Sequence, residues 1–177
     1  MKWVLKKSIG LMIAVIYHNA LASTTLETVG DIGQIALPIT AASTTLFKSD
    51  FKGFSEFAYS YLLSTASVHL LKYTVHRERP NHGNQSFPSG HTANGFVAAS
   101  FLQFRYGWKY GAPAYAAAAV TGYSRIQAKK HWTTDVLVGA AIGIGSSFLF
   151  TDRYIKITPY YHPENNEMGV AATAQLS

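Results

Sequence analysis

The stretch from Ser86 to Phe96, SFPSGHTANGF, places a histidine beside the expected start of a helix. Pro88 fixes the approach of the chain, and Ser89 is a residue type that commonly caps a helix N-terminus. The exposed N–H groups of a helix start, with a hydroxyl beside them, can also bind an anion. The stretch alone therefore permits two interpretations, a simple N-cap or an anion cradle with His91 at its edge.

Two cations precede this stretch at the end of an expected helix over residues 54–75. Lys72 falls on the same helical stripe as Thr65 and Val68, where an inward-facing apolar residue is expected. An inward lysine needs an anion, and Arg79 follows just beyond the helix end. The alternative is a helix C-terminus whose basic residues complement the helix dipole.

A third polar group surrounds the start of an expected helix over residues 132–150. Ser124 and Arg125 come first, followed by His131 and, four residues later, Asp135. On a helix this spacing predicts that Asp135 accepts a hydrogen bond from one ring nitrogen of His131. The other nitrogen is then left to act as a nucleophile or base. An ordinary surface His–Asp pair is the alternative.

One bound phosphate would explain the three cations, the helix start and the two histidines together. The motifs resemble the signature of the type 2 phosphatidic acid phosphatases, with the related bacterial acid phosphatases and vanadium haloperoxidases. That signature is a lysine ahead of Arg-Pro, then Pro-Ser-Gly-His, then Ser-Arg with a histidine and an aspartate after it. Every specified position matches within residues 54–150: Lys72, Arg79, Pro80, Pro88, Ser89, Gly90, His91, Ser124, Arg125, His131 and Asp135.

The resemblance implies a helical bundle with a phosphate site and a role for each matching residue. The residues that it implies bind the phosphate oxygens are Lys72, Arg79, Ser89, Gly90 and Arg125. His131 would attack phosphorus to form a phosphohistidine and would be oriented by Asp135. His91 would protonate the leaving oxygen and then activate water. Fixed cations can replace metal ions in phosphoryl transfer, and no carboxylate-rich cluster is visible, so we predict metal independence and no cofactor.

Several apolar segments must position these residues. The segments expected to form helices are 32–47, 54–75, 92–106, 112–127 and 132–150. Their periodicity and alanine content predict an all-α bundle, and Gly139 and Gly143 indicate close helix packing. The uninterrupted apolar stretches are about 14 to 18 residues long, shorter than the roughly 20 of a membrane-spanning helix. Packing on each other, or insertion into one leaflet, therefore fits better than full crossings. Alternation around Asn165 and Asn166 predicts a C-terminal β-hairpin.

The first 22 residues have the features of a secretory signal: a basic start, an apolar run and an Ala20-Leu21-Ala22 cleavage site. An uncleaved N-terminal anchor is the alternative. The predicted organisation is a signal peptide (1–22), a helical phosphatase domain (23–150) and a C-terminal tail (151–177). Cleavage would remove three lysines and no acidic residue, so the net charge would fall from +6 to +3. That charge is too small to indicate nucleic-acid binding. The chain has no cysteine, which excludes disulfides and thiolate chemistry.

Together these features predict an exported, metal-independent phosphatase that hydrolyses phosphomonoesters or diphosphates. Lipid phosphates are favoured because the helix faces are apolar and rich in aromatic residues. We expect it in the periplasm or at the periplasmic face of a bacterial membrane. Three alternatives remain at this point: a soluble non-specific acid phosphatase, a vanadate-dependent haloperoxidase, and a non-enzymatic envelope protein with a vestigial anion site.

Overall fold

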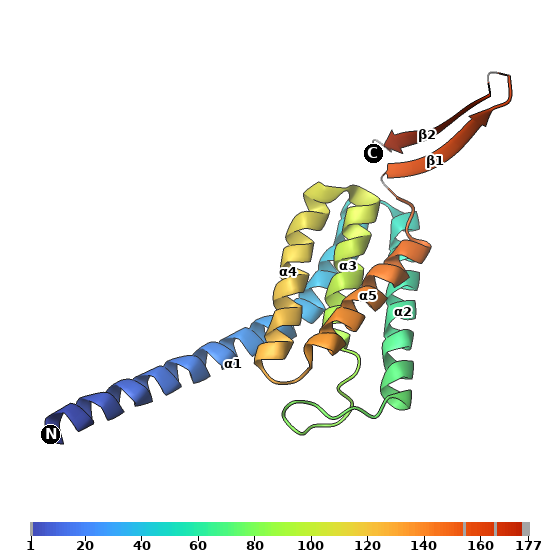
Figure 1. Ribbon diagram of the computed structural model, residues 1–177. Coiled ribbons are helices and arrows are strands. Elements are labelled where there is room, and N and C mark those ends of the chain that lie inside the picture. Colours follow the sequence, from blue (N-terminus) through green and yellow to red (C-terminus); the bar gives the residue numbers. More distant parts are fainter. Residues whose placement is uncertain (1, 154, 165, 175–177) are drawn as a thin grey trace.

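The computed structural model describes residues 2–153, 155–164 and 166–174, with side chains described for 25–153, 160–164 and 166–171. These residues form a helical bundle and a small antiparallel hairpin (Figure 1), which confirms the predicted fold class. The elements are α1 (Lys2–Phe47), α2 (Phe51–Thr74), α3 (Gly90–Tyr106), α4 (Trp108–Gln127), α5 (Thr133–Phe150), β1 (Ile155–His162) and β2 (Glu167–Ala174).

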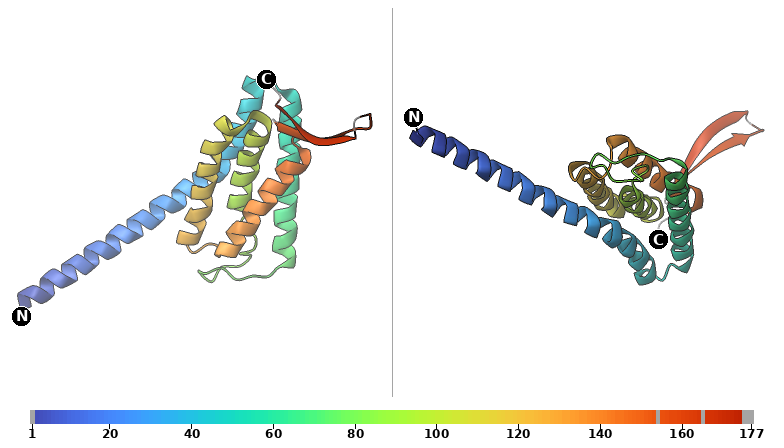
Figure 2. Two further views of the ribbon diagram at one scale, coloured as in Figure 1. Left: turned by 45° about the horizontal axis from the view of Figure 1, so that its top comes forward. Right: turned by 90° about the horizontal axis from the view of Figure 1, so that it is seen from below.

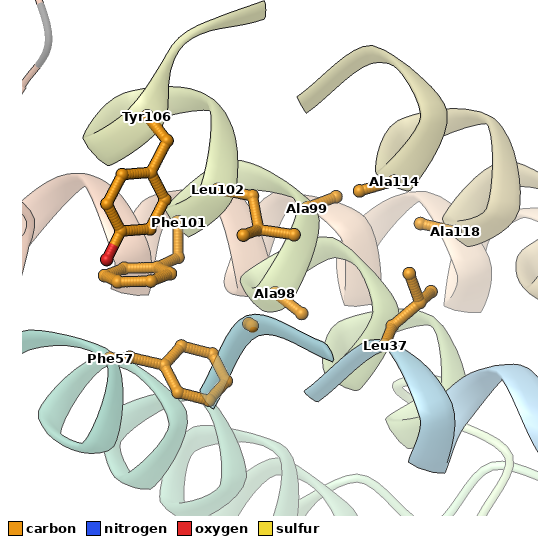
Figure 3. Packing of buried hydrophobic residues seen from close by; sticks show 10 residues of the cluster. Leu37, Phe57, Ala98, Ala99, Phe101, Leu102, Tyr106, Ala114 and Ala118 are labelled. Atoms are coloured by element: carbon orange, nitrogen blue, oxygen red, sulfur yellow. The ribbon is translucent and has the colours of Figure 1, made fainter. Parts of the chain in front are cut away.

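Helix α3 is the central element, because it packs against α1, α2, α4 and α5. Its buried face meets aromatic and small side chains of its neighbours (Figure 3). The rings of Phe57 and Phe101 lie 5.0 Å apart between centroids, and Tyr106 meets Phe101 edge-on at 5.9 Å. Around them, alanines such as Ala98 and Ala118 let the helix backbones approach closely. Full burial of a side chain the size of Phe101 contributes about 2 kcal/mol to stability.

Two glycines of α5 allow this helix to lie directly on the backbone of α3. A Cβ atom on Gly143 would lie 2.6 Å from the Ala93 carbonyl oxygen, and one on Gly139 would lie 2.5 Å from the Ser89 carbonyl oxygen. The close packing predicted for these glycines is therefore confirmed. It brings the start of α5 against the start of α3, where the Ser89 N–H donates to the Asp135 carbonyl at 3.0 Å.

The direction of the helices alternates after α1, and this decides where the polar motifs meet. The C-terminal ends of α2 and α4 and the N-terminal starts of α3 and α5 lie together at the lower end of the bundle in Figure 1. All three sequence motifs fall at these helix ends. We call this region the cavity end, because a cavity opens here. Fold topology thus gathers residues that lie far apart in the sequence.

The opposite end of the bundle carries a network of ion pairs, which we call the salt-bridge end. Arg105 donates to Asp50 at 2.8 and 2.9 Å and to Glu56 at 3.2 Å. Lys52 pairs with Asp152 at 2.5 Å. These contacts join the start of α2 to the end of α3 and to the segment after α5.

Helix α1 is longer than the segment predicted over 32–47. It runs without a break from Lys2 through the predicted cleavage site to Phe47, and its N-terminal part extends away from the bundle (Figures 1 and 2). Met1 lies outside the described residues. Cleavage after Ala22 stays a prediction.

The predicted C-terminal hairpin is confirmed. Strands β1 and β2 pair antiparallel, with Ile155 opposite Ala174 and His162 opposite Glu167. The hairpin projects away from the helices (Figure 2). Of the two asparagines predicted at its turn, Asn165 lies outside the described residues and Asn166 directly precedes β2.

Candidate active site

A cavity of about 580 Å³ opens at the cavity end of the bundle. Residues of α1, α2, α3 and α4 and of the connecting loops line it. The basic and imidazole side chains in its lining are His69, Lys72, Arg79, His91, Arg125, Lys130 and His131. The structure therefore brings together the three cations and two histidines that the sequence motifs single out.

Lys72 and Arg79 face the cavity from the end of α2 and the loop that follows. The Lys72 Nζ donates to the Gln85 carbonyl at 2.8 Å, and the Arg79 Nε donates to the Asn84 carbonyl at 3.0 Å. Among the described side chains, no carboxylate lies within ion-pair distance of either cation. Two positive charges at the cavity are thus held in place by neutral carbonyls.

Arg125 lies in the last turn of α4 and is only 2% exposed. Its Nε donates to the Ser124 hydroxyl at 2.9 Å, its Nη1 to the Asp31 carboxylate at 2.7 Å, and its Nη2 to the Glu27 carbonyl. These contacts require α1 to pass very close to α4. Gly30 makes this possible, because any side chain there would collide with Arg125 and Ser124.

The start of α3 presents His91 and the Gly90 backbone to the cavity. The His91 Nε2 lies 2.9 Å from the Asp31 carboxylate. Ser89 is fully buried as the N-cap, where its hydroxyl accepts from the Thr92 hydroxyl at 2.9 Å and from the Thr92 N–H at 3.4 Å. Ser89 does not line the cavity, so its contact with phosphate stays a prediction, whereas the alternative N-cap role is present.

His131 and Asp135 are arranged differently from the prediction. His131 precedes α5, and its Nδ1 donates to the Ser86 carbonyl at 2.6 Å, whereas the nearest Asp135 oxygen is 3.7 Å away. The predicted direct hydrogen bond is therefore absent. The reason is that Asp135, the third residue of α5, uses its Oδ2 to accept from the Trp132 N–H at 2.9 Å and from the Ser86 hydroxyl at 2.5 Å. Asp135 thus acts on His131 through Ser86.

The hydrogen bond to Ser86 fixes the tautomer of His131. A carbonyl oxygen can only accept, so the proton is on Nδ1 and Nε2 keeps its lone pair. Burial, followed by the nearby Lys72 cation, lowers the pKa of His131 from 6.5 to about 4. The ring is only 4% exposed and is neutral at neutral pH. It therefore has the protonation state that a nucleophile needs.

Arg77 is a site residue that the sequence motifs did not identify. Its guanidinium donates to Asp135 at 2.8 Å and to the Thr134 hydroxyl at 2.7 Å, and it lies over the Trp132 ring at 5.6 Å. The Arg77 carbonyl accepts from the Ser86 N–H at 2.8 Å. Arg77 therefore holds Asp135 and Ser86 in place, and these two residues position His131.

Asp31 and Glu27 are the other residues that sequence reasoning missed. They lie one turn apart on α1, and both line the cavity. A signal for them exists in the sequence: two carboxylates at helical i, i+4 spacing lie immediately before an apolar segment. Which side chains Asp31 meets, however, depends on helix packing across 60 to 94 residues of sequence.

In the part of the chain that the structure describes, no group of three or more His, Asp or Glu side chains could hold a metal ion. Independence from metal ions stays a prediction. A helical bundle that gathers three cations and a neutral histidine around one cavity is typical of an enzyme that transfers phosphoryl groups by positioning and charge stabilisation.

Comparison with known proteins identifies the family. The family model described as PAP2 superfamily matches residues 54–158. The lipid A 4'-phosphatase of Helicobacter pylori is 34% identical in an alignment 141 residues long that covers 73% of this chain and 71% of the relative. The lipid A 1-phosphatase of Porphyromonas gingivalis is 41% identical in an alignment 91 residues long that covers 49% of this chain and 20% of the relative.

A solved structure agrees with the sequence relatives. The crystal structure of Aquifex aeolicus LpxE matches with a TM-score of 0.65 and 26% identity, over 73% of this chain and 84% of that chain. The chain therefore belongs to the PAP2 superfamily. The predicted family and the predicted phosphatase class are both confirmed.

Proposed function

We propose that this protein is a membrane-bound phosphatase that hydrolyses lipid phosphates through a phosphohistidine formed on His131. The observation that carries the proposal is the placement of a buried, neutral histidine beside cations that lack a carboxylate partner. A phosphate group in the cavity would supply the missing negative charge. It would also lie within reach of the His131 lone pair.

The three cations bind and polarise the phosphoryl group. Lys72, Arg79 and Arg125 approach the cavity from α2, its following loop and α4, so they can contact different phosphate oxygens. The Gly90 N–H at the start of α3 adds a helix-terminal donor, and we keep the Ser89 hydroxyl as a second predicted donor. Fixed cations stabilise the charge that spreads over the phosphoryl oxygens in the transition state.

The reaction proceeds in two displacements. In the first, the Nε2 lone pair of His131 forms a bond to phosphorus, the bond to the leaving oxygen breaks, and protonated His91 gives its proton to that oxygen. In the second, water attacks phosphorus, His91 takes a proton from the water, and the bond between His131 and phosphorus breaks. Inorganic phosphate leaves, and both histidines return to their starting states.

Asp135 has a positioning role in this scheme. Its carboxylate holds the Ser86 hydroxyl, and the Ser86 carbonyl holds the His131 Nδ1–H. These linked hydrogen bonds keep the His131 Nε2 directed to the cavity with its lone pair free. Arg77 holds the Asp135 carboxylate in place through an ion pair of 2.8 Å.

An apolar groove beside the cavity supports a lipid substrate. The groove has a volume of about 400 Å³ and lies between α1 and α2, where its apolar lining includes Ile35, Ile39 and Phe54. Gln34, Tyr61 and Asn94 line both this groove and the catalytic cavity. A hydrocarbon chain in the groove would therefore continue from a headgroup in the cavity. The two relatives that are named as lipid A phosphatases support the same substrate class.

The outer faces of the helices support membrane association. Leu62 and Leu70 on α2, Trp108 on α4, and Leu137 and Leu149 on α5 are each more than 60% exposed. Large exposed apolar area is a mark of contact with a membrane or with another protein. One helix in the described part of the chain, α5, is also long and apolar enough to cross a membrane. We place the catalytic end at the periplasmic face, in keeping with the predicted export signal.

Phosphate release from lipid phosphates tests the proposal. The full chain is purified in detergent, and its activity is compared with that of His131→Ala and His82→Ala. His82 is 89% exposed, and among the described residues its side chain pairs only with Glu78. It therefore serves as the matched control. We expect no turnover for His131→Ala, full turnover for His82→Ala, and activity that survives EDTA. Normal turnover by His131→Ala would overturn the proposal.

A further inference from the structure

A single carboxylate oxygen on α1 contacts two members of the proposed catalytic site. The Asp31 Oδ1 lies 2.9 Å from the His91 Nε2 and 2.7 Å from the Arg125 Nη1. Asp31 lies outside residues 54–158, the part matched by the family model. The contact therefore involves a residue outside the signature motifs.

This position defines the side of the cavity from which the leaving group departs. In the proposed reaction, His91 protonates the leaving oxygen and Arg125 binds the phosphoryl group. A leaving oxygen that accepts from His91 while its phosphoryl group contacts Arg125 lies close to where the Asp31 Oδ1 now lies, so the substrate takes over these contacts and displaces the carboxylate. The rest of the leaving group then lies towards α1.

Charge differs between the two sides of the cavity. The transferred phosphoryl group meets Lys72, Arg79 and Arg125. On the α1 side, the carboxylate of Glu27 is balanced by Lys130 at 3.1 Å, whereas Asp31 loses its contacts with His91 and Arg125 once the substrate takes them. A leaving group on this side therefore meets an uncompensated negative charge.

We propose that Asp31 makes the enzyme select phosphomonoesters over diphosphates. This inference rests on the proposed function. An alcohol is neutral once His91 has protonated it, so it departs past Asp31 without charge repulsion. The leaving group of a diphosphate is itself a phosphate and stays negatively charged after the same proton transfer. Repulsion from the Asp31 carboxylate disfavours its binding and its departure.

The test compares two substrates with the same hydrocarbon chain, farnesyl phosphate and farnesyl diphosphate, in detergent micelles. The ratio of kcat/KM for the two is measured for the unmodified protein and for Asp31→Asn. Asparagine keeps an oxygen that can accept from His91 and Arg125 but removes the charge. Glu164→Gln, in the exposed turn of the hairpin, is the control for loss of a negative charge away from the cavity.

We expect the unmodified protein and Glu164→Gln to prefer the monoester. Asp31→Asn should shift the ratio towards the diphosphate by about fivefold, because the Asp31 side chain is 51% exposed and its field is partly screened by water. Both substrates are measured on one preparation, so the fraction of folded protein cancels in the ratio. Asp31→Ser repeats the measurement with a smaller neutral side chain.

The outcomes separate this inference from the proposed function. An unchanged ratio in both Asp31 variants, or a preference of the unmodified protein for the diphosphate, would overturn the selective role of Asp31 while leaving the phosphatase intact. Failure of the unmodified protein to hydrolyse either substrate would overturn the proposed function, and the selective role with it.

Discussion

The two polar ends of the bundle use the same residue types for different purposes. At the salt-bridge end, Arg105 is surrounded by Asp50 and Glu56, and Lys52 pairs with Asp152. At the cavity end, Lys72 and Arg79 meet carbonyl oxygens and an open cavity. Charges that are matched within the chain stabilise the fold. Charges left without a carboxylate partner are available for a ligand.

The pKa of Asp50 shows that hydrogen bonds at the salt-bridge end stabilise a charged carboxylate. Burial raises the pKa of Asp50, but hydrogen bonds from Arg105, the Gly53 N–H and Tyr106 outweigh this and hold the pKa at about 2. The folded state therefore favours the charged carboxylate. This contribution to stability is complete above pH 3.8, the ordinary pKa of the group, and is lost as the pH falls through about 2.

The largest expected effect comes from a cation at the cavity end. Lys72→Met should lower kcat/KM for a lipid phosphate by two to three orders of magnitude, or about 3 to 4 kcal/mol, because a fixed charge on the phosphoryl group is lost. The thermal midpoint in detergent should stay the same or rise, since no ion pair is broken. A marked fall in the midpoint together with unchanged activity would show that Lys72 is structural.

Substitution at the salt-bridge end should have the opposite result. Arg105→Met leaves Asp50 and Glu56 partly buried without their cation, which should lower the free energy of unfolding by about 3 kcal/mol. Because these residues lie at the other end of the bundle, kcat of the folded protein should change by less than about twofold, within the scatter of a remote substitution. Thermal unfolding and phosphate release on one preparation check both expectations. Loss of kcat at an unchanged midpoint would contradict the division of roles.

A smaller effect concerns the acid limit of activity. Since burial and Lys72 lower the pKa of His131 to about 4, the ring stays neutral well below its ordinary value of 6.5. The acid limb of kcat/KM should therefore fall near pH 4. Lys72→Met removes the second-largest cause of the lowered pKa, so the limb of its residual activity should move to higher pH. A limb at 6.5 in the unmodified protein would show that His131 is not held neutral by its surroundings.

The sequence predicted the helices and the hairpin because these depend on local patterns. It predicted the grouping of the motifs because one bound phosphate would explain them together and because they match a family signature. Hydrophobic periodicity determines which face of each helix is buried. The spacing of Gly139 and Gly143 indicates close helix packing. The prediction for His131 and Asp135 was wrong in its detail for a physical reason. Spacing on one helix cannot show that Ser86, from a distant loop, competes for the carboxylate. Hydrogen bonds that cross between elements depend on packing, which a single sequence does not display.

The same reason explains why the contribution of α1 could be seen only in the structure. Asp31 and Glu27 lie before the first apolar segment that the sequence identifies, and nothing in their spacing connects them to Arg125. Their position depends on the close approach of α1 to α4 at Gly30. The phosphate site is thus completed by a helix that carries none of its signature motifs.

In the proposed mechanism, the phosphoryl group passes through His131 in two successive displacements. The stereochemistry at phosphorus tests this most directly, using a lipid phosphate ester made chiral at phosphorus by oxygen isotopes and transfer to an alcohol acceptor in place of water. Each in-line displacement inverts the configuration, so two displacements restore it. We therefore expect overall retention of configuration. Overall inversion would show direct attack on the substrate in a single step and would contradict a phosphohistidine intermediate.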